Sequence, residues 1–299
     1  MSLAKQLFHI LLTFGPSHTA RRISQALSAK FNEWIRSLRH VRRIRSLEKD
    51  STLIITCVGK HFEVNPHDFG LHRDLISDRI REPVATSIML SIAQETDVLL
   101  DAGANIGYFS LLLADHCQKV YSIEPDIINL KALERNILLN KTKNIQTFNL
   151  ALSDNSEPLY LNSSSKSNWH STTKQADRDS KKISALSVDE FCERENIQPT
   201  ILKMDIEGFE KYVIPGAKKT LSKLKALFFE LHSTHLTLEE TNSILDVIEQ
   251  SGLCLYKVIR YDRPGLWKEE SLNIVDLVRK GDYGIYEMIY TTPSQRGPS

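Results

Sequence analysis

Carboxylates follow two apolar runs of this sequence, and a glycine-rich stretch lies between them. The run 98–100 ends in Asp101, after which the chain passes through Gly103 and Gly107, and a second apolar run ends in Glu124. A glycine-rich turn between a strand and a helix lets the backbone approach a nucleotide-like ligand. A carboxylate about 20 residues further on can accept hydrogen bonds from both hydroxyls of a ribose. This spacing predicts a nucleoside-binding site.

The residues around the first glycine favour S-adenosylmethionine over a dinucleotide. A dinucleotide fingerprint reads G-x-G-x-x-G and holds a pyrophosphate, whereas this turn reads Gly103-Ala-Asn-Ile-Gly107. Asp101 would repel a pyrophosphate there but can hold an ammonium group. S-adenosylmethionine carries an ammonium group as well as an adenosine. The alternatives are an Asp101 that only caps a turn and, for function, a NAD-dependent oxidoreductase.

Chemistry-bearing side chains gather again at the ends of two later apolar runs. Asp205 and Glu207 follow the run 201–204, and His232 follows the run 227–231. The carboxyl ends of neighbouring parallel strands meet at the edge of a sheet where ligands bind. An imidazole titrates near neutral pH, and a positioned base helps to remove a proton from a hydroxyl. We therefore assign Asp205, Glu207 and His232 as catalytic residues.

A divalent metal between Asp205 and Glu230 is a competing arrangement, because oxygen-rich ligand sets suit magnesium. Two acids and one histidine are thin support for it. His232 and His235 also lack the i, i+4 spacing of a helical metal-binding pair. We therefore assign no metal ligands from the sequence.

The elements that position these residues are predicted to alternate between strands and helices. Apolar runs and helical spacing predict strands over 98–101, 119–123, 145–150, 201–204 and 227–231, with helices over 107–115, 126–139, 188–195, 212–224 and 236–251. Two late strand-like runs, 253–259 and 284–290, have no crossover helix between them, which predicts an antiparallel pair at the sheet edge. A hairpin over 53–64 and a helix over 80–93 precede this α/β order.

Four stretches resemble the FkbM-type family of S-adenosylmethionine-dependent methyltransferases, namely 101–110, 122–125, 133–136 and 202–210. The resemblance implies a Rossmann-like methyltransferase fold, with a mostly parallel seven-stranded sheet and an antiparallel C-terminal edge pair. It also implies O-methylation of a hydroxyl on a sugar, glycan or secondary metabolite. Asn105 stands where methyltransferases in general have a glycine, and it matches this family. The candidate cofactor-binding residues are Glu82, Asp101, Gly103, Asn105, Gly107, Glu124 and Ala151.

The chain is divided into a basic helical N-terminal extension (1–50), a lead-in hairpin and helix (51–95) and a methyltransferase domain (96–292). A polar insertion, 153–185, interrupts that domain. Residues 1–50 hold ten Lys/Arg against three Asp/Glu, and the apolar positions of 21–45 recur at helical spacing. This pattern predicts an amphipathic helix that packs on the domain, or alternatively contacts a membrane surface or a polyanion.

The remaining composition narrows the class of protein. Four scattered cysteines without a C-x-x-C pair favour a reducing, cytoplasmic compartment, and no apolar run approaches the ~20 residues that span a membrane. We expect a small-molecule or carbohydrate acceptor, selected by the insertion and by the stretch 260–283. A nucleic-acid substrate is not expected, because the body of the chain is acidic and lacks an Asn/Asp-Pro-Pro-aromatic motif. A protein that binds the cofactor without turnover is the other alternative.

Overall fold

The computed structural model describes most of the chain beyond residue 52. The described ranges are 53–56, 58–66, 71–162, 171–175, 180–260, 268–270 and 272–295. The predicted extension 1–50, with its basic helix over 21–45, lies outside the described residues.

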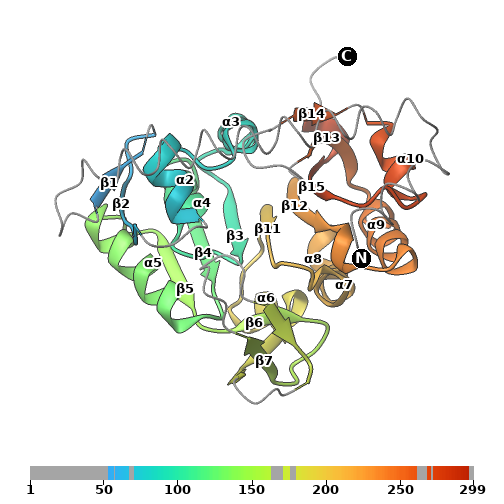
Figure 1. Ribbon diagram of the computed structural model, residues 1–299, viewed down its shortest axis with the longest axis horizontal. Helices are drawn as coiled ribbons and strands as arrows, with labels where there is room; N and C mark the ends of the chain where they lie inside the picture. Colours follow the sequence, from blue (N-terminus) through green and yellow to red (C-terminus); the bar gives the residue numbers. More distant parts are fainter. Residues whose placement is uncertain are drawn as a thin grey trace.

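An eight-stranded sheet forms the centre of the molecule, in the order β14-β13-β15-β12-β11-β3-β4-β5 (Figure 1). Five strands are parallel: β3 (Val98–Ala102), β4 (Lys119–Ile123), β5 (Ile145–Phe148), β11 (Ile201–Met204) and β12 (Ala226–His232). β15 (Ile285–Thr291) runs antiparallel to both of its neighbours, β12 and β13 (Cys254–Arg260). The predicted seven strands and their antiparallel edge are confirmed, and the short β14 (Lys268–Glu270) adds an eighth.

Helices cover both faces of this sheet, which explains why its central strands are buried. All seven residues of β12 are buried, as expected for a strand between two helical layers. One face packs against α2 (Leu71–Asp78), α3 (Pro83–Ile92), α4 (Tyr108–Ala114) and α5 (Ile127–Leu139). The other face packs against α6 (Val188–Arg194), α7 (Glu210–Val213), α8 (Lys218–Leu221), α9 (Leu238–Gln250) and α10 (Ile274–Val278).

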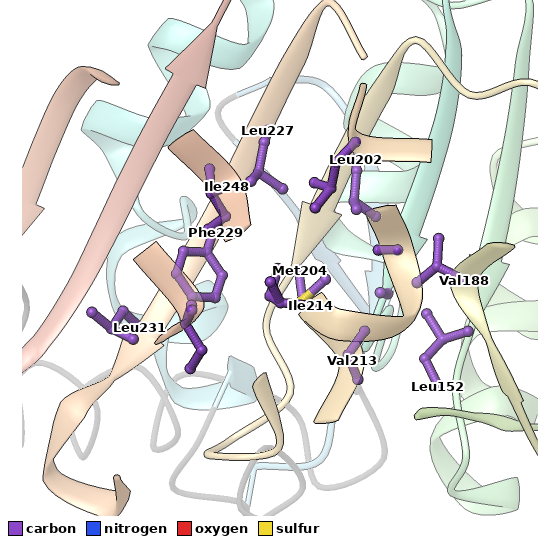
Figure 2. Close-up of a cluster of buried hydrophobic side chains, with 14 of the residues drawn as sticks. Leu152, Val188, Leu202, Met204, Val213, Ile214, Leu227, Phe229, Leu231 and Ile248 are labelled. Carbon is purple, nitrogen blue, oxygen red and sulfur yellow. The ribbon is translucent and has the colours of Figure 1, made fainter. Parts of the chain in front are cut away.

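The second of these layers holds the larger hydrophobic core. Side chains from β11 and β12 alternate in direction, so that one set points to each face. Figure 2 shows the set that faces the second layer, namely Leu202, Met204, Leu227, Phe229 and Leu231. These side chains pack with Val213, Ile214 and Ile248 of that layer. The opposite set from the same strands includes Lys203, Glu230 and His232, which are charged or titratable and still buried.

The predicted lead-in hairpin is confirmed and is attached to the main domain. β1 (Leu53–Ile55) pairs antiparallel with β2 (His61–Glu63). Two asparagines of α5 accept hydrogen bonds from β2: the backbone N of Glu63 donates to Asn136 Oδ1 at 2.8 Å, and that of His61 to Asn140 Oδ1 at 2.9 Å. The sequence did not predict α2. The helix expected from residue 80 begins instead at Pro83, whose missing N–H costs nothing in a first turn.

The polar insertion, for which the sequence predicts no strand or helix, contains short strands in its described part. β6 (Ala151–Ser153) pairs with β10 (Ala185–Ser187). β7 (Leu159–Asn162) pairs antiparallel with β8 (Ser171–Thr173) and β9 (Lys181–Ile183), forming a small sheet at the lower end of Figure 1. Strands of three or four residues are too short to leave a readable alternation in the sequence. Leu159 and Leu161 are nevertheless buried.

The helix predicted over 212–224 is broken into α7, the 3-10 turn η1 (Ile214–Ala217) and α8. Pro215 lacks an N–H, and Gly216 packs so closely on the insertion that a Cβ there would lie 2.6 Å from the carbonyl oxygen of Ser153. The helix is therefore interrupted at the point where this segment packs closely against the start of the insertion.

Candidate active site

A pocket lies at the carboxyl ends of β3, β4 and β11, where the sequence places its two groups of candidates. Six of the ten predicted site residues line it: Gly103, Asn105, Glu124, Ala151, Asp205 and Glu207. The other four, Glu82, Asp101, Gly107 and His232, are not among the lining residues. The pocket wall also includes Arg81, Phe109, Asn129, Leu161 and Lys203, none of which the sequence singled out as site residues.

The glycine turn brings the backbone of two strand ends into contact. Gly103 has φ +79° and Gly107 has φ +90°, conformations that favour glycine. A Cβ on Gly103 would overlap the backbone carbonyl oxygen of Asp205, and one on Gly107 would overlap the side chain of Leu133 on α5. Gly103 therefore permits the close approach of β3 and β11, while Gly107 permits the packing of α4 against α5.

We expect Gly103→Ala to destabilise the protein by more than the strain of its backbone conformation alone. A side chain in this conformation costs about 1–3 kcal/mol, and the overlap with the Asp205 carbonyl adds to it. Gly59→Ala is the matched control, because Gly59 has φ +78° with no atom within 4 Å of its added Cβ. Urea unfolding of both variants measures the difference. Equal losses of unfolding free energy would show that the contact between the two strand ends is unimportant.

Glu124 ends β4 and is fixed at the pocket wall. Only 5% of the residue is exposed. Its Oε2 accepts a hydrogen bond from the backbone N of Asn105 at 2.8 Å, and its Oε1 from the backbone N of Asp126 at 2.9 Å. Burial raises the pKa of this carboxyl to about 7, against the backbone donors of Asp126 and Asn105 and the side chain of Asn129, which lower it. These three donors use part of the acceptor capacity of the carboxylate, and the remainder is open to a ligand.

Asp101 lies behind the lining of the pocket. It is 1% exposed, and its Oδ2 accepts a hydrogen bond from Ser110 Oγ at 2.5 Å. Its Oδ1 has no hydrogen-bond partner among the described residues. Lys203 lies opposite Asp101 in the pairing of β3 with β11, and burial raises the pKa of the Asp101 carboxyl despite that ammonium. Asp101 therefore acts on the pocket from behind the residues that line it.

Two cations that sequence reasoning missed neutralise part of this acidic wall. Lys203 Nζ lies 3.4 Å from Asp205 Oδ2 and 4.9 Å from the centre of the Phe109 ring. Arg81 contacts Glu82 at 2.7 Å and Asp74 at 3.0 Å. The available signal was a lysine inside the otherwise apolar run 201–204. Such a residue is rarely buried unless it is paired.

The charge of Asp205 depends on these cations. Burial acts to raise the pKa of its carboxyl, but Lys203, with His232 and Arg81, outweighs burial and lowers that pKa to about 2. The neighbouring carboxylates, chiefly Asp205, raise the pKa of Lys203 against the effect of burial. Lys203 and Asp205 are therefore held as a charged pair in the pocket wall.

His232 is buried between carboxylates on both sides of its ring. Its Nδ1 lies 2.9 Å from Glu210 Oε1 and its Nε2 lies 3.2 Å from Glu207 Oε2. Burial lowers the pKa of the imidazole, but Glu207, Glu210 and Glu230 outweigh it and raise that pKa well above its ordinary value. The expected near-neutral titration is therefore not found, since these carboxylates favour the imidazolium. Glu207 itself has φ +52° and precedes Gly208 at φ +94°.

Two further buried acids flank this group. Glu230 on β12 lies directly opposite Glu287 on β15. Glu287 is fully buried, and neither of its carboxylate oxygens has a hydrogen-bond partner among the described residues. Burial raises the pKa of both carboxyls, which also repel neighbouring acids. The sequence had proposed Glu230 only as a metal ligand, and it gave no signal for Glu287.

A parallel sheet with a glycine turn after its first strand, an acid after its second and an antiparallel edge strand defines a Rossmann-like methyltransferase. The chain belongs to the methyltransferase FkbM domain family, whose model matches residues 101–258. That match covers both groups of site residues and a little over half of the chain. The predicted family is therefore confirmed, and with it S-adenosylmethionine as the cofactor of the class.

One relative is the hexuronic acid methyltransferase AglP of Haloferax volcanii, 26% identical over 159 residues. The match covers 53% of this chain and 65% of that protein, so the chain spans less than two thirds of the length of its relative.

Solved methyltransferases are also similar in structure. An rRNA methylase from Streptococcus thermophilus has a TM-score of 0.43 and 9% identity, with 71% of this chain and 97% of that chain covered. TYW2 of M. jannaschii in complex with AdoMet has a TM-score of 0.39 and 17% identity, with 82% and 89% covered. At these TM-scores the assignment of the fold depends on the sheet topology and the family match.

Among the residues that the structure describes, no helix has the length and apolar character needed to cross a membrane. Three cysteines, Cys117, Cys192 and Cys254, are free thiols.

Proposed function

We propose that this methyltransferase transfers the methyl group of S-adenosylmethionine to a hydroxyl oxygen of a sugar, a glycan or a small hydroxylated metabolite. The observation that carries the proposal is the single pocket in which a ribose-type carboxylate, Glu124, meets the acidic strand-end residues Asp205 and Glu207. Cofactor recognition and hydroxyl chemistry both require carboxylates, and here the carboxylates for both tasks line the same pocket.

The residues of the pocket fit the cofactor. Glu124 keeps acceptor capacity for ribose hydroxyls, beside the backbone of Asn105. Ile123, Ala151 and Leu152 offer apolar surface for an adenine.

The methionine end of the cofactor carries a carboxylate and an ammonium group, and the pocket offers cations and acids that can pair with them. We assign its carboxylate to Arg81 and Lys203, which line the pocket. Its ammonium group is assigned to the acidic side, where Glu82 and Asp101 are buried behind the lining. When bound, S-adenosylmethionine supplies an already activated methyl group.

The chain's own residues then have to place the acceptor and take its proton. The acceptor oxygen forms a bond to the methyl carbon, and the carbon–sulfur bond breaks with its electron pair going to sulfur. The hydroxyl proton must leave at the same time. We assign Glu207, which faces the pocket, to accept it, and Asp205 to hold the acceptor in line. His232 is a positioning residue, because it holds Glu207 from behind the lining.

A carbohydrate acceptor is supported by the relative that acts on a hexuronic acid. The insertion supports a role in acceptor selection, since Leu161 of β7 reaches the pocket wall. Because Cys117, Cys192 and Cys254 are free, we also propose a reducing, cytoplasmic setting.

The proposal is tested with radiolabelled S-adenosylmethionine and a panel of sugars, glycans and hydroxylated metabolites. Label transferred to at least one acceptor is the expected result. Parallel calorimetric titrations with S-adenosylmethionine and NAD separate a methyltransferase from an oxidoreductase. Binding of NAD alone would contradict the proposal, and cofactor binding with no acceptor in any class would favour a binding protein without turnover.

Cofactor affinity is expected to depend on Glu124 and on pH. Loss of a hydrogen bond to a charged group costs about 1.5–3 kcal/mol, so Glu124→Ala should weaken binding by roughly ten- to a hundredfold. The carboxylate must be ionised to accept both hydroxyls, and its pKa of about 7 leaves it mostly protonated at pH 6. Affinity for the wild-type chain should therefore fall about tenfold from pH 8 to pH 6.

Calorimetric titrations at both pH values check this prediction. Glu124→Gln is the control, since its amide does not titrate and should remove the pH dependence. An unchanged affinity in Glu124→Ala, or an equal pH dependence in Glu124→Gln, would move the ribose site elsewhere.

A further inference from the structure

At the pocket there are two groups of side chains, each of which brings three potential metal ligands together. Asp205, Glu207 and His232 form the first group, and Glu82, Asp205 and Glu230 form the second. Within each group the ligand atoms lie within 4.8 Å of one another. Asp205 belongs to both, so one ion at most uses its free oxygen, Oδ1, which has no hydrogen-bond partner among the described residues.

The second group already contains its counter-ions. Arg81 Nε lies 2.7 Å from Glu82 Oε1, and Lys203 Nζ lies 3.4 Å from Asp205 Oδ2. Lys203 lies beside the residue that both groups share, whereas the Arg81 guanidinium contacts only Glu82 at this distance and would repel a divalent cation there, so the second group is the poorer metal site. In the part of the chain that the structure describes, by contrast, Glu207 forms an ion pair with His232 and with no lysine or arginine.

The first group has the arrangement found around metal-binding histidines. Such a histidine usually donates its second ring N–H to a carboxylate, which fixes the ring and its tautomer. Here Glu210 Oε1 lies 2.9 Å from His232 Nδ1 and also accepts a hydrogen bond from the backbone N of Gly208 at 2.9 Å. The other ring nitrogen, Nε2, faces Glu207, and the carboxylates of Asp205 and Glu207 line the pocket. A cation bound there would keep open positions on the pocket side.

The side chains behind the group include buried carboxylate oxygens that have no hydrogen-bond partner among the described residues. Glu210 is fully buried, and its Oε2 has no hydrogen-bond partner among the described residues. Glu287 is also fully buried with both oxygens unsatisfied, and it lies opposite Glu230, whose Oε1 is 3.9 Å from His232 Nε2. Buried carboxylate oxygens in proteins are normally hydrogen-bonded or coordinate a metal. The unpartnered oxygens of Asp205 and of Glu210, which adjoins His232, therefore point to a cation at the first group.

We infer that Asp205, Glu207 and His232 bind one divalent transition-metal ion, with Glu210 as the residue that orients the histidine. A mixed set of one imidazole and two carboxylates suits Mn²⁺, Fe²⁺ or Zn²⁺ better than Mg²⁺, which prefers oxygen alone. The role of the ion, though not its binding, rests on the proposed function: it holds the acceptor hydroxyl and stabilises the negative charge that develops on its oxygen. A sugar with neighbouring hydroxyls can occupy two open positions of such an ion.

Mn²⁺ is the probe for this inference, because free Mn²⁺ can be quantified by electron paramagnetic resonance. The full chain is treated with a chelator, desalted and titrated with Mn²⁺. One tight site is expected in the wild-type chain, and at least a hundredfold weaker binding in Glu207→Gln and His232→Gln. Glu210→Gln should weaken binding about 10–100-fold, as changes to such orienting groups do. Circular dichroism confirms that each variant is folded.

Two controls make the result specific to the first group. Glu82→Gln alters only the second group and should bind Mn²⁺ as the wild type does, as should Glu95→Gln at an exposed acid. Equal affinity in Glu207→Gln and the wild type, or a loss in Glu82→Gln as large as in Glu207→Gln, would overturn the inference. So would the absence of a Mn²⁺ site in the wild-type chain.

The heat of S-adenosylmethionine binding is measured on the same samples. A chain that binds the cofactor but no Mn²⁺ contradicts only the metal site. A chain that binds Mn²⁺ but neither binds the cofactor nor transfers a methyl group contradicts only the proposed function.

Discussion

Asp205→Asn and Glu207→Gln are expected to lower methyl transfer by about 10²–10⁴-fold while leaving cofactor affinity within a few-fold of wild type. A group that helps to remove a proton contributes about this much to the rate. Both side chains line the pocket after β11, which is separated from β4 and Glu124 by β3, so their loss should affect the reaction more than ribose recognition. An interaction made only in the transition state lowers turnover without weakening ground-state binding.

Turnover and cofactor binding should be measured on the same preparations, with the acceptor identified by the radiolabel panel. Glu134→Gln is a suitable control, because that acid is exposed on α5 and does not line the pocket. Wild-type turnover in both variants would remove Asp205 and Glu207 from the reaction. A large loss of cofactor affinity in Glu207→Gln would instead place that residue in the cofactor site.

Lys203→Met is expected to destabilise the fold by about 3–5 kcal/mol at pH 8, the range found when one partner of a buried ion pair is removed. The methionine keeps the apolar stem over Phe109 but leaves Asp205, Glu82 and Asp101 without this ammonium. In the wild-type chain the pKa of Asp205 is lowered to about 2, so the stabilisation from its charged form is present above its unfolded pKa and is lost as pH falls through 2.

The pH dependence of that destabilisation identifies its cause. Without Lys203 the carboxyl pKa values rise, so protonation relieves their repulsion and the loss should shrink between pH 8 and pH 5. Urea unfolding at both pH values, with Lys131→Met on the exposed face of α5 as control, measures it. A loss that is small, or equal at the two pH values, would show that Lys203 stabilises the protein through packing rather than charge.

The elements that could be predicted from the sequence are those with long apolar runs or clear caps. β4 was predicted at 119–123 and has those bounds. α9 begins one residue after Thr237, whose side chain forms a capping box with Glu240. The small sheet of the insertion was missed, because the burial of Leu159 and Leu161 depends on contacts distant in the sequence and three-residue strands carry no periodicity.

The candidate site was predictable where a residue's role follows from its place at a strand end. Gly103, Glu124, Asp205 and Glu207 were found this way, and all four line the pocket. Arg81 could not be found, since it enters the wall through the loop between α2 and α3. The charge states of the site residues were harder to predict from the sequence than their positions. The raised pKa of His232 depends on Glu207, Glu210 and Glu230, which three-dimensional packing brings around one ring.

The contact between the glycine turn and the Asp205 backbone also has a thermodynamic consequence. The turn contacts the cofactor in the proposed function, and the loop after β11 contacts the acceptor, yet no side-chain layer separates them at Gly103. Any shift of the turn on cofactor binding is therefore transmitted to the acceptor loop. Binding free energies are reciprocal, so each ligand should change the affinity of the other by the same factor. The close contact at Gly103 thus links the two binding equilibria in the proposed function.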